Sequence, residues 1–241
     1  MQGKVALVTG AGRGLGSRLA LHLAEKGFDL ALHCHRSRGG AEEIRETIRL
    51  MDGRRAEVFQ ADLSGEAGAV SLAGEVTRSF GRLDLLVNNA GVYHEKGFLD
   101  LTEEEWFAEL NSTATAVYFT TRAFLPLLRA SRGRVVNLGD GACDRPGARS
   151  MAPAYHIGKT GGFILTRSFA KSEAPYGVPV NLVSPGLLET SVGLTSPQAD
   201  HVPAGRFGQD ADVFAALDFL AWEATPYLTG SNLVVGGGWN L

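Results

Sequence analysis

A tyrosine and a lysine four residues apart, Tyr155 and Lys159, are the side chains of this sequence best suited to proton transfer. Residues four apart share one face of a helix, and Pro153 indicates a helix that begins just before Tyr155. A phenol with a pKa near 10 is a slow proton donor at neutral pH unless its anion is stabilised. An ammonium group and the positive end of a helix both favour the phenolate, so we expect them to lower the pKa of Tyr155. The pair predicts a general acid with a group that tunes it; the alternative is an inert surface tyrosine and lysine.

A glycine-rich turn, TGAGRGLG at residues 9–16, follows the apolar run Val5–Val8 and precedes leucines at helical spacing. The spacing is TGxxxGxG rather than GxGxxG, with glycines at Gly10, Gly14 and Gly16. Glycines let the backbone approach a pyrophosphate, and the free N–H groups of a helix N-terminus attract its negative charge. The turn therefore predicts a dinucleotide site, and the alternative is a tight turn that binds nothing.

The residues after the second apolar run favour NADP over NAD. An NAD site has an acidic residue about 20 residues beyond the glycine turn. Here the chain reads HCHRSR at residues 33–38 and has no acid before Glu42. Arg36 can hold a 2′-phosphate in a forked geometry, Ser37 can donate to it, and Arg13 adds positive charge from the turn. The alternative is a solvated basic loop.

The elements that must position these groups alternate between strands and helices. Short apolar runs typical of strands occur at Val5–Val8, Leu30–His33, Ala56–Phe59, Leu83–Val87, Arg134–Leu138, Val180–Val183 and Leu233–Val235. Helical spacing lies between them, as in Leu15, Leu19 and Leu23. Strands that are continuously apolar are covered on both faces, which indicates the parallel sheet of a doubly wound α/β fold with helices on both faces.

The composition excludes several classes of protein. The chain has 241 residues, 44% of them hydrophobic, and a net charge of -3, which gives no reason to expect nucleic acid or an anionic membrane as partner. We find no signal peptide or membrane span and expect a cytoplasmic protein. Its two cysteines, Cys34 and Cys143, are expected to be reduced thiols. His33 and His35 would share a strand face with Cys34 opposite, so we interpret all three as structural and predict no metal site.

Five motifs together make the chain similar to the short-chain dehydrogenase/reductase family from Lys4 to Trp239. They are TGAGRGLG at 9–16, NNAG at 88–91, Asn111 in a long helix, YHIGK at 155–159 and PGLLET at 185–190. The resemblance implies one Rossmann-type domain over residues 1–241, with seven parallel strands and a substrate loop near 187–209. It also implies hydride exchange between a nicotinamide and a carbonyl or alcohol. A homotetramer or homodimer would form through the helices that begin near Glu103 and Pro153.

The same resemblance implies roles for individual residues. Tyr155 is the acid, Lys159 also holds the nicotinamide ribose, and Asn111 orients a water that relays protons to the lysine. Asp62 is expected to contact the adenine, and Asn88 to lie with Ala90 and Gly91 on the sugar and phosphate side. The expected NADP(H) contacts are Gly10, Arg13, Gly14, Leu15, Gly16, Arg36, Ser37, Asp62, Leu63, Asn89, Ala90, Gly91, Tyr155, Lys159, Pro185, Gly186 and Thr190.

Asp140 stands where the family normally has its catalytic serine, after the strand GRVVNLG. Counting back from Tyr155 lands instead on Ala142, so neither alignment supplies a serine, and Ser150 would need an unusual path to the substrate. A serine hydroxyl can donate to a developing oxyanion, whereas an ionised carboxylate can only accept. We expect an ionised Asp140, which suits a substrate that presents an N–H or a cation. Alternatively Asp140 only caps the turn at Gly141.

Three functions are compatible with these residues. The first is NADPH-dependent reduction of a carbonyl, because PGLLET, VPAGRFG and YLTGSNLVVGGGW resemble 3-oxoacyl-acyl-carrier-protein reductases. The second is a pteridine reductase-like enzyme that uses Asp140 as an acceptor, although such enzymes typically carry an arginine in place of Gly14. The third is a cofactor-binding sensor whose catalysis has decayed, which the retained Tyr155, Lys159 and Asn111 disfavour.

An acyl carrier is a conceivable source of the carbonyl substrate. Some relatives place a basic residue before the glycine at 177 to meet an acidic carrier protein, but this chain has Tyr176 there. Arg129, Arg132 and Arg134 are the basic residues expected to substitute for it.

Overall fold

Seven parallel strands form one sheet in the order β3-β2-β1-β4-β5-β6-β7. The structure, a computed structural model, describes residues 1, 3–51, 53–145, 147–191 and 201–239. All six strand pairings are parallel. This confirms the expected seven-stranded, doubly wound α/β sheet of the Rossmann type, whose strand order reverses direction between β1 and β4. Residues 192–200, inside the expected substrate loop, lie outside the described part of the chain.

The strands fall within a few residues of the apolar runs that predict them. They are β1 (Val5–Val8), β2 (Asp29–Cys34), β3 (Ala56–Gln60), β4 (Leu85–Asn88), β5 (Arg134–Leu138), β6 (Val180–Pro185) and β7 (Asn232–Val235). The α-helices are α1 (Gly14–Glu25), α2 (Arg38–Arg49), α3 (Glu66–Phe80), α4 (Glu103–Leu110), α5 (Ala116–Ser131), α6 (Pro153–Glu173) and α7 (Asp210–Asp218). Short π or 3₁₀ segments are η1 (Asn111–Thr115), η2 (Ala174–Tyr176) and η4 (Phe219–Glu223).

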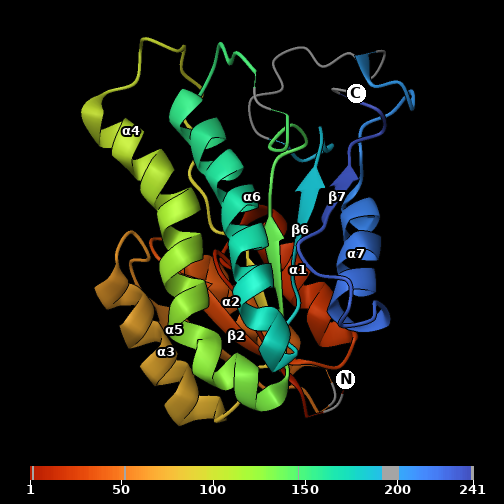
Figure 1. Ribbon diagram of the computed structural model, residues 1–241. Helices are drawn as coiled ribbons and strands as arrows, with labels where there is room; N and C mark the ends of the chain where they lie inside the picture. Colours follow the sequence, from red (N-terminus) through yellow and green to blue (C-terminus); the bar gives the residue numbers. More distant parts are fainter. Residues whose placement is uncertain (2, 52, 146, 192–200, 240–241) are drawn as a thin grey trace.

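Two apolar cores, one on each face of the sheet, hold the layers together. Alternate residues of β1 show the division: Ala6 and Val8 belong to the core that includes α1 and α7, whereas Val5 and Leu7 belong to the core that includes α3 and α5. All four side chains are almost fully buried, as expected for strands covered on both faces. Helices α3 to α6 lie on the near side of the sheet in Figure 1.

Helices α4, η1 and α5 run on from one another, with Asn111 at the first position of the π segment. Thr102 begins α4 with a capping box in which Thr102 and Glu105 satisfy each other's backbone N–H groups. The adjacent helix α6 approaches η1 closely, because a Cβ on Gly158 would overlap the hydroxyl of Thr113. A π segment inside a helix is often found at a functional site, and this one faces the start of α6.

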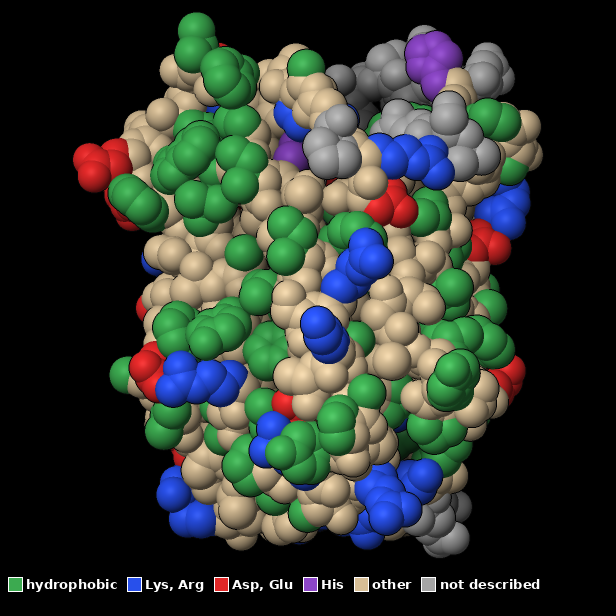
Figure 2. All heavy atoms as spheres, in the orientation of Figure 1, with side chains coloured by type: hydrophobic (Ala, Val, Ile, Leu, Met, Phe, Trp, Pro, Cys, Tyr) green, Lys and Arg blue, Asp and Glu red, His purple; other side chains and the backbone are tan. Residues whose placement is uncertain are grey.

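The surface in Figure 2 shows apolar side chains over α4 and α5 on the face toward the reader. Large exposed apolar residues of these helices and α6 are Phe107, Tyr118, Ile157 and Ile164, with 50%, 39%, 53% and 60% of their surface accessible. The described helices include none that is both long and apolar enough to span a bilayer. Among the described residues, no cluster of His, Cys, Asp and Glu could ligate a metal, and both cysteines are free and buried.

Candidate active site

The glycine turn lies between the end of β1 and the start of α1, and at Gly10 and Gly16 the packing leaves little or no room for a side chain. Gly10 has φ of 69°, in the left-handed region, and a Cβ there would lie 3.1 Å from the Cα of Ala90. A Cβ on Gly16 would overlap the carbonyl oxygen of Gly10 and the side chain of Asn89. The turn therefore packs directly on the Asn89–Ala90 segment after β4. This places two of the expected binding motifs side by side at the crevice where the strand order reverses.

Thr9 joins the glycine turn to the Asn89–Ala90 segment by hydrogen bonds. Its hydroxyl accepts hydrogen bonds from the N–H groups of Asn89 at 2.9 Å and Ala90 at 3.0 Å. The side chain of Asn89 donates back to the Thr9 carbonyl at 2.9 Å. Thr9 was not among the expected site residues, although it is the first residue of the TGxxxGxG motif. Asn88 differs from expectation, because its side chain is buried and donates to Thr121 and Asn137 instead of lining a ligand site.

The basic residues expected at the 2′-phosphate lie beside the glycine turn. Ser37 contacts the turn closely, because a Cβ on Gly12 would overlap the Ser37 hydroxyl. The neighbouring Arg36 is exposed, as is Arg13, the residue that precedes α1. An exposed guanidinium next to a turn of this kind has the charge and reach to meet a phosphate.

Asp62 and Leu63 follow β3, at the same end of the parallel sheet as the glycine turn. One carboxylate oxygen of Asp62 accepts a hydrogen bond from the N–H of Ser64 at 2.9 Å, which lowers the pKa of Asp62. Its side chain remains 56% exposed, so the carboxylate is accessible to a ligand. Leu63 is instead buried in the core, at 5% exposure, and only its backbone is placed to contact a ligand.

Tyr155 and Lys159 meet near the carboxyl ends of β4 and β5. The ammonium nitrogen of Lys159 lies 5.4 Å from the centre of the Tyr155 ring and donates to the carbonyl of Leu138 at 2.7 Å. A Cβ on Gly91 would be 3.8 Å from both Lys159 Nζ and Tyr155 Cε2. Pro153 begins α6 as expected. The Tyr155 ring, the Lys159 amine and the NNAG segment thus lie close together.

The surroundings of Tyr155 act against the expected effect of Lys159. Burial, followed by the negative charge of Asp140, raises the pKa of the Tyr155 phenol instead of lowering it. Burial also lowers the pKa of Lys159 to about 8, against the opposing attraction of Asp140. The expectation of a lowered phenol pKa is therefore wrong for the protein alone. Burial disfavours the charged form of an amine because the ammonium loses its hydration, so Lys159 gives up its proton more readily than an exposed lysine.

Asp140 is bonded within its own loop. One carboxylate oxygen accepts from the N–H of Ala142 at 3.0 Å, and the Asp140 carbonyl accepts from the N–H of Cys143 at 2.9 Å. The other carboxylate oxygen lies 3.8 Å from Nδ1 of His156. That nitrogen is buried and has no hydrogen-bond partner within the described residues. Asp140 therefore forms the turn that the sequence offered as the alternative to a catalytic role, and it still lies close enough to act on Tyr155 through its charge.

Glu109 is a second carboxylate at this site, and the sequence did not single it out. It is fully buried at the end of α4, and its two oxygens accept from the N–H groups of Tyr155 and His94, each at 2.8 Å. Tyr155 is the third residue of α6, so Glu109 satisfies a free N–H of that helix from a neighbouring helix. Only its position two residues before Asn111 could have drawn attention to it. Asn111 itself accepts from the Thr115 hydroxyl at 3.2 Å.

Pro185 ends β6, and Gly186 and Thr190 follow it in the segment that packs against the Asp140 loop. A Cβ on Gly141 would lie 3.2 Å from the Cα of Gly186, so the two loops pack backbone to backbone. The Thr190 hydroxyl accepts from Arg18 of α1 at 2.8 Å, which ties this segment to the glycine-turn helix. The expected site residues described above therefore gather at one end of the sheet, where the strands of Figure 1 point and where α6 begins.

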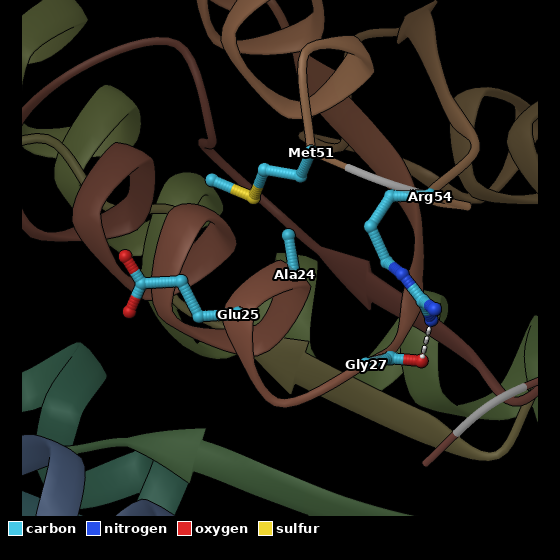
Figure 3. Close-up of a pocket in the computed structure, with 5 residues that line it drawn as sticks. All are labelled: Ala24, Glu25, Gly27, Met51 and Arg54. Carbon is cyan, nitrogen blue, oxygen red and sulfur yellow. Dashed lines mark hydrogen bonds between the residues drawn. The ribbon is translucent and has the colours of Figure 1, made fainter.

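A surface hollow elsewhere offers no comparable chemistry. It lies between the end of α1 and the residues before β3, and Figure 3 shows Ala24, Glu25, Gly27, Met51 and Arg54 around it. Arg54 donates to the carbonyl of Gly27 at 2.5 Å. None of these residues belongs to the motifs above, so we locate the candidate active site at the carboxyl ends of the strands.

Comparisons with known proteins match most of the chain. The family model of the short chain dehydrogenases matches residues 4–200. The chain is 34% identical, over 99% of its length and 98% of the relative's, to the 3-oxoacyl-[acyl-carrier-protein] reductase FabG of Haemophilus influenzae. FabG of Pseudomonas aeruginosa is 31% identical over 99% of this chain and 98% of its own.

Two solved structures share the fold over nearly their whole length. A short chain dehydrogenase from Burkholderia cenocepacia, in complex with NADP, has a TM-score of 0.90 and 32% identity, covering 100% of this chain and 99% of that one. A blue fluorescent protein from a metagenomic library, in complex with NADPH, has a TM-score of 0.89 and 28% identity, with coverage of 100% and 99%.

Proposed function

This chain belongs to the short-chain dehydrogenase family, and we propose that it is an NADP-dependent oxidoreductase that reduces a carbonyl group to an alcohol. The observation that carries the proposal is the close approach of Tyr155, Lys159 and Gly91 to one another beside the glycine turn. NADP and NADPH are bound in the two similar structures. The absence of an acid between the end of β2 and Glu42, together with the exposed Arg36, supports NADP over NAD here.

The residues present fit this cofactor. The glycine turn brings its backbone N–H groups to the start of α1, an arrangement that suits a pyrophosphate. Arg36, Ser37 and Arg13 would hold the 2′-phosphate, and Asp62 the adenine side. Lys159, Asn89 to Gly91, and Pro185 to Thr190 would hold the nicotinamide half.

The chain's own residues manage the proton. NADPH, when bound, supplies the hydride that adds to the carbonyl carbon. Tyr155 donates the phenol proton to the carbonyl oxygen, because negative charge develops there as the bond is reduced. Lys159, held by the Leu138 carbonyl, offsets the charge left on the phenolate. Asn111 lies in η1, which packs against α6, and we assign it the water that returns a proton toward Lys159.

The substrate class we propose is a 3-oxoacyl thioester, as in the reductases named FabG. Two of the three arginines expected to meet an acidic carrier are engaged within the chain: Arg129 pairs with Glu173 at 2.7 Å and lies over the ring of Tyr176, and Arg134 donates to two carbonyls near η4. Arg132, the third, is exposed. The acyl group itself is the part of the substrate that the proposal commits to.

The pteridine reductase-like alternative depends on a free carboxylate at Asp140. One oxygen of Asp140 is already bonded to Ala142, and the other faces His156. These contacts favour the carbonyl over an N–H-bearing heterocycle as substrate. NADPH consumption with acyl thioesters against dihydropteridines separates the two functions, and binding without turnover of either would indicate the decayed sensor.

The decisive variant is Tyr155→Phe, with Tyr93→Phe as its matched control, because the two rings touch edge to face at 5.2 Å. Tyr155→Phe should lower kcat by about a thousandfold or more while the Kd for NADPH stays within a few-fold. Tyr93→Phe should keep most of the activity. Turnover retained by Tyr155→Phe would remove that residue from the acid role.

We also propose that residues 1–241 form one catalytic domain and that it assembles as a homotetramer or homodimer through the face of α4, α5 and α6. The exposed apolar side chains of these helices support this proposal. Exposed apolar faces of this kind are commonly buried in subunit interfaces.

A further inference from the structure

We propose that His33 is a positioning residue that joins the glycine turn to the end of β3 and thereby sets the affinity of the protein for NADPH. This inference rests on the proposed function, since it concerns the adenosine half of that cofactor. It assigns a role to a histidine that the sequence alone marked only as structural.

The His33 ring is bonded at both nitrogens to different segments of the chain. Nδ1 accepts a hydrogen bond from the N–H of Gly10 at 3.2 Å, and Nε2 lies 3.1 Å from the carbonyl oxygen of Ala61. The backbone carbonyl of His33 also accepts from the N–H of Ala11 at 2.8 Å. Three hydrogen bonds therefore connect the end of β2 to the first residues of the glycine turn and to the residue before Asp62.

These contacts require one protonation state. A carbonyl can only accept, so Nε2 carries the hydrogen, and Nδ1 must be bare to accept from Gly10. His33 is 2% exposed, and burial lowers its pKa to about 4. The ring is therefore neutral at physiological pH, in the single tautomer that satisfies both partners.

Both partners adjoin residues expected to contact the cofactor. Gly10 begins the turn that would hold the pyrophosphate, and Ala61 precedes Asp62, which would face the adenine. A pyrophosphate and an adenine are joined through a single ribose, so the distance between these segments decides whether both can be bound at once. The His33 ring spans that distance.

If His33 served only to fill space in the core, its hydrogen bonds would not matter for NADPH binding. Cys34, the next residue of β2, is equally buried, and its backbone carbonyl accepts from the N–H of Ala61 at 3.1 Å, but its thiol makes no hydrogen bond to the glycine turn or to Ala61. A smaller side chain at Cys34 tests what loss of packing in β2 does by itself. His33 variants test the hydrogen bonds, because Asn can replace the Nδ1 acceptor and Gln can replace the Nε2 donor.

The experiment measures the Kd for NADPH by fluorescence titration, kcat at saturating NADPH, and Tm, for the full chain and for His33→Leu, His33→Asn, His33→Gln and Cys34→Ala. We expect His33→Leu to weaken NADPH binding by roughly tenfold or more with kcat changed less than twofold. His33→Asn and His33→Gln should each recover part of the affinity. Cys34→Ala should lower Tm without weakening NADPH binding.

Unchanged affinity in folded His33→Leu would overturn the proposal, as would equal losses of affinity in His33→Leu and Cys34→Ala. If His33→Leu does not fold, wild-type affinity in both the Asn and Gln variants overturns it, whereas intermediate affinity supports it. A wild-type chain that does not bind NADPH would overturn the proposed function together with this inference. Wild-type binding and turnover, with His33 variants unaffected, would overturn the inference alone.

Discussion

At the scale of single residues, the charge around Tyr155 decides how readily its phenol exchanges a proton. Asp140 is the largest charge that raises its pKa, with smaller effects from Tyr93, Glu109 and Cys143. The ammonium nitrogen of Lys159 lies 5.4 Å from the centre of the Tyr155 ring, and its positive charge acts in the opposite direction to these negative charges. The acid is therefore kept protonated by burial and by its carboxylate neighbours, a state suited to donation in the direction of reduction.

Asp140→Ser should move the pH dependence of the reaction toward lower pH. Asp140 raises the pKa of Tyr155, so its removal lowers that pKa, and the phenolate needed for alcohol oxidation then forms at lower pH. The half-maximal pH of kcat for oxidation should fall, and the alkaline decline of reduction should begin earlier. Asp144→Asn, in the same loop, is the control that should leave both limbs in place. An unshifted profile in Asp140→Ser would show that Asp140 serves the turn alone.

Arg36→Ala should weaken NADPH binding by about 10- to 100-fold, the loss expected for a charge-assisted hydrogen bond to phosphate. Binding of NADH, which has no 2′-phosphate, should change little. Arg38→Ala is the matched control, because Arg38 already contacts Gln60 and Glu42. Titration of each variant with both nucleotides measures the difference, and equal NADPH affinity in Arg36→Ala and the wild type would mean that the 2′-phosphate is held elsewhere.

At the scale of elements, the start of α6 is fixed from outside the helix. Ala152, which precedes it, has φ of 43° and gives no side-chain cap. The carboxylate of Glu109 supplies the missing acceptor and joins the end of α4, the loop at His94 and the first turn of α6. The close approach of Gly158 to Thr113 adds a second point of contact between α6 and η1. The direction in which Tyr155 points depends on these helix contacts.

Glu109→Gln should therefore lower both stability and turnover. An amide can accept from only one of the two N–H groups and turns its own NH₂ toward the other, which costs about 1 to 3 kcal/mol for the buried group left unsatisfied. Unfolding in urea measures that loss. We expect kcat to fall by roughly tenfold, because Tyr155 loses its fixed position. Glu104→Gln, exposed on the same helix, is the control, and a stable, fully active Glu109→Gln would contradict this role.

At the scale of the whole molecule, one face differs from the rest. Helices α4, α5 and α6 carry Phe107, Tyr118, Ile157 and Ile164 in exposed positions, and the same helices carry Tyr155, Lys159 and Glu109 on their inner side. Covering this face with a second subunit would hold the helices that set the geometry of the site.

Ile164→Glu should therefore dissociate the assembly. Size-exclusion chromatography with light scattering should give a wild-type mass of two or four times 25.6 kDa and a lower mass for the variant. A buried charge opposes association because it loses its hydration without gaining a partner. Leu50→Glu, at an exposed leucine after α2, should leave the mass unchanged. A monomeric wild type would contradict the proposed interface.

The sequence by itself determined the fold class, the glycine turn and the order of the motifs. Continuous apolar runs such as Val5–Val8 report burial on both faces, and Gly10 reports a backbone that no side chain permits. These constraints are local, so they can be recognised from the sequence alone. Pro153 likewise marked the first residue of α6.

Only the tertiary structure decided the electrostatics and the supporting contacts. Burial, and then the charges of Asp140 and Glu109 from other elements, raise the pKa of Tyr155, and burial lowers the pKa of Lys159 to about 8; spacing along one helix contains neither effect. The roles of Thr9, His33 and Glu109 arise from partners far apart in sequence. Hydrogen bonds and charges act through space, and the packing of the helices on the sheet sets which of them meet.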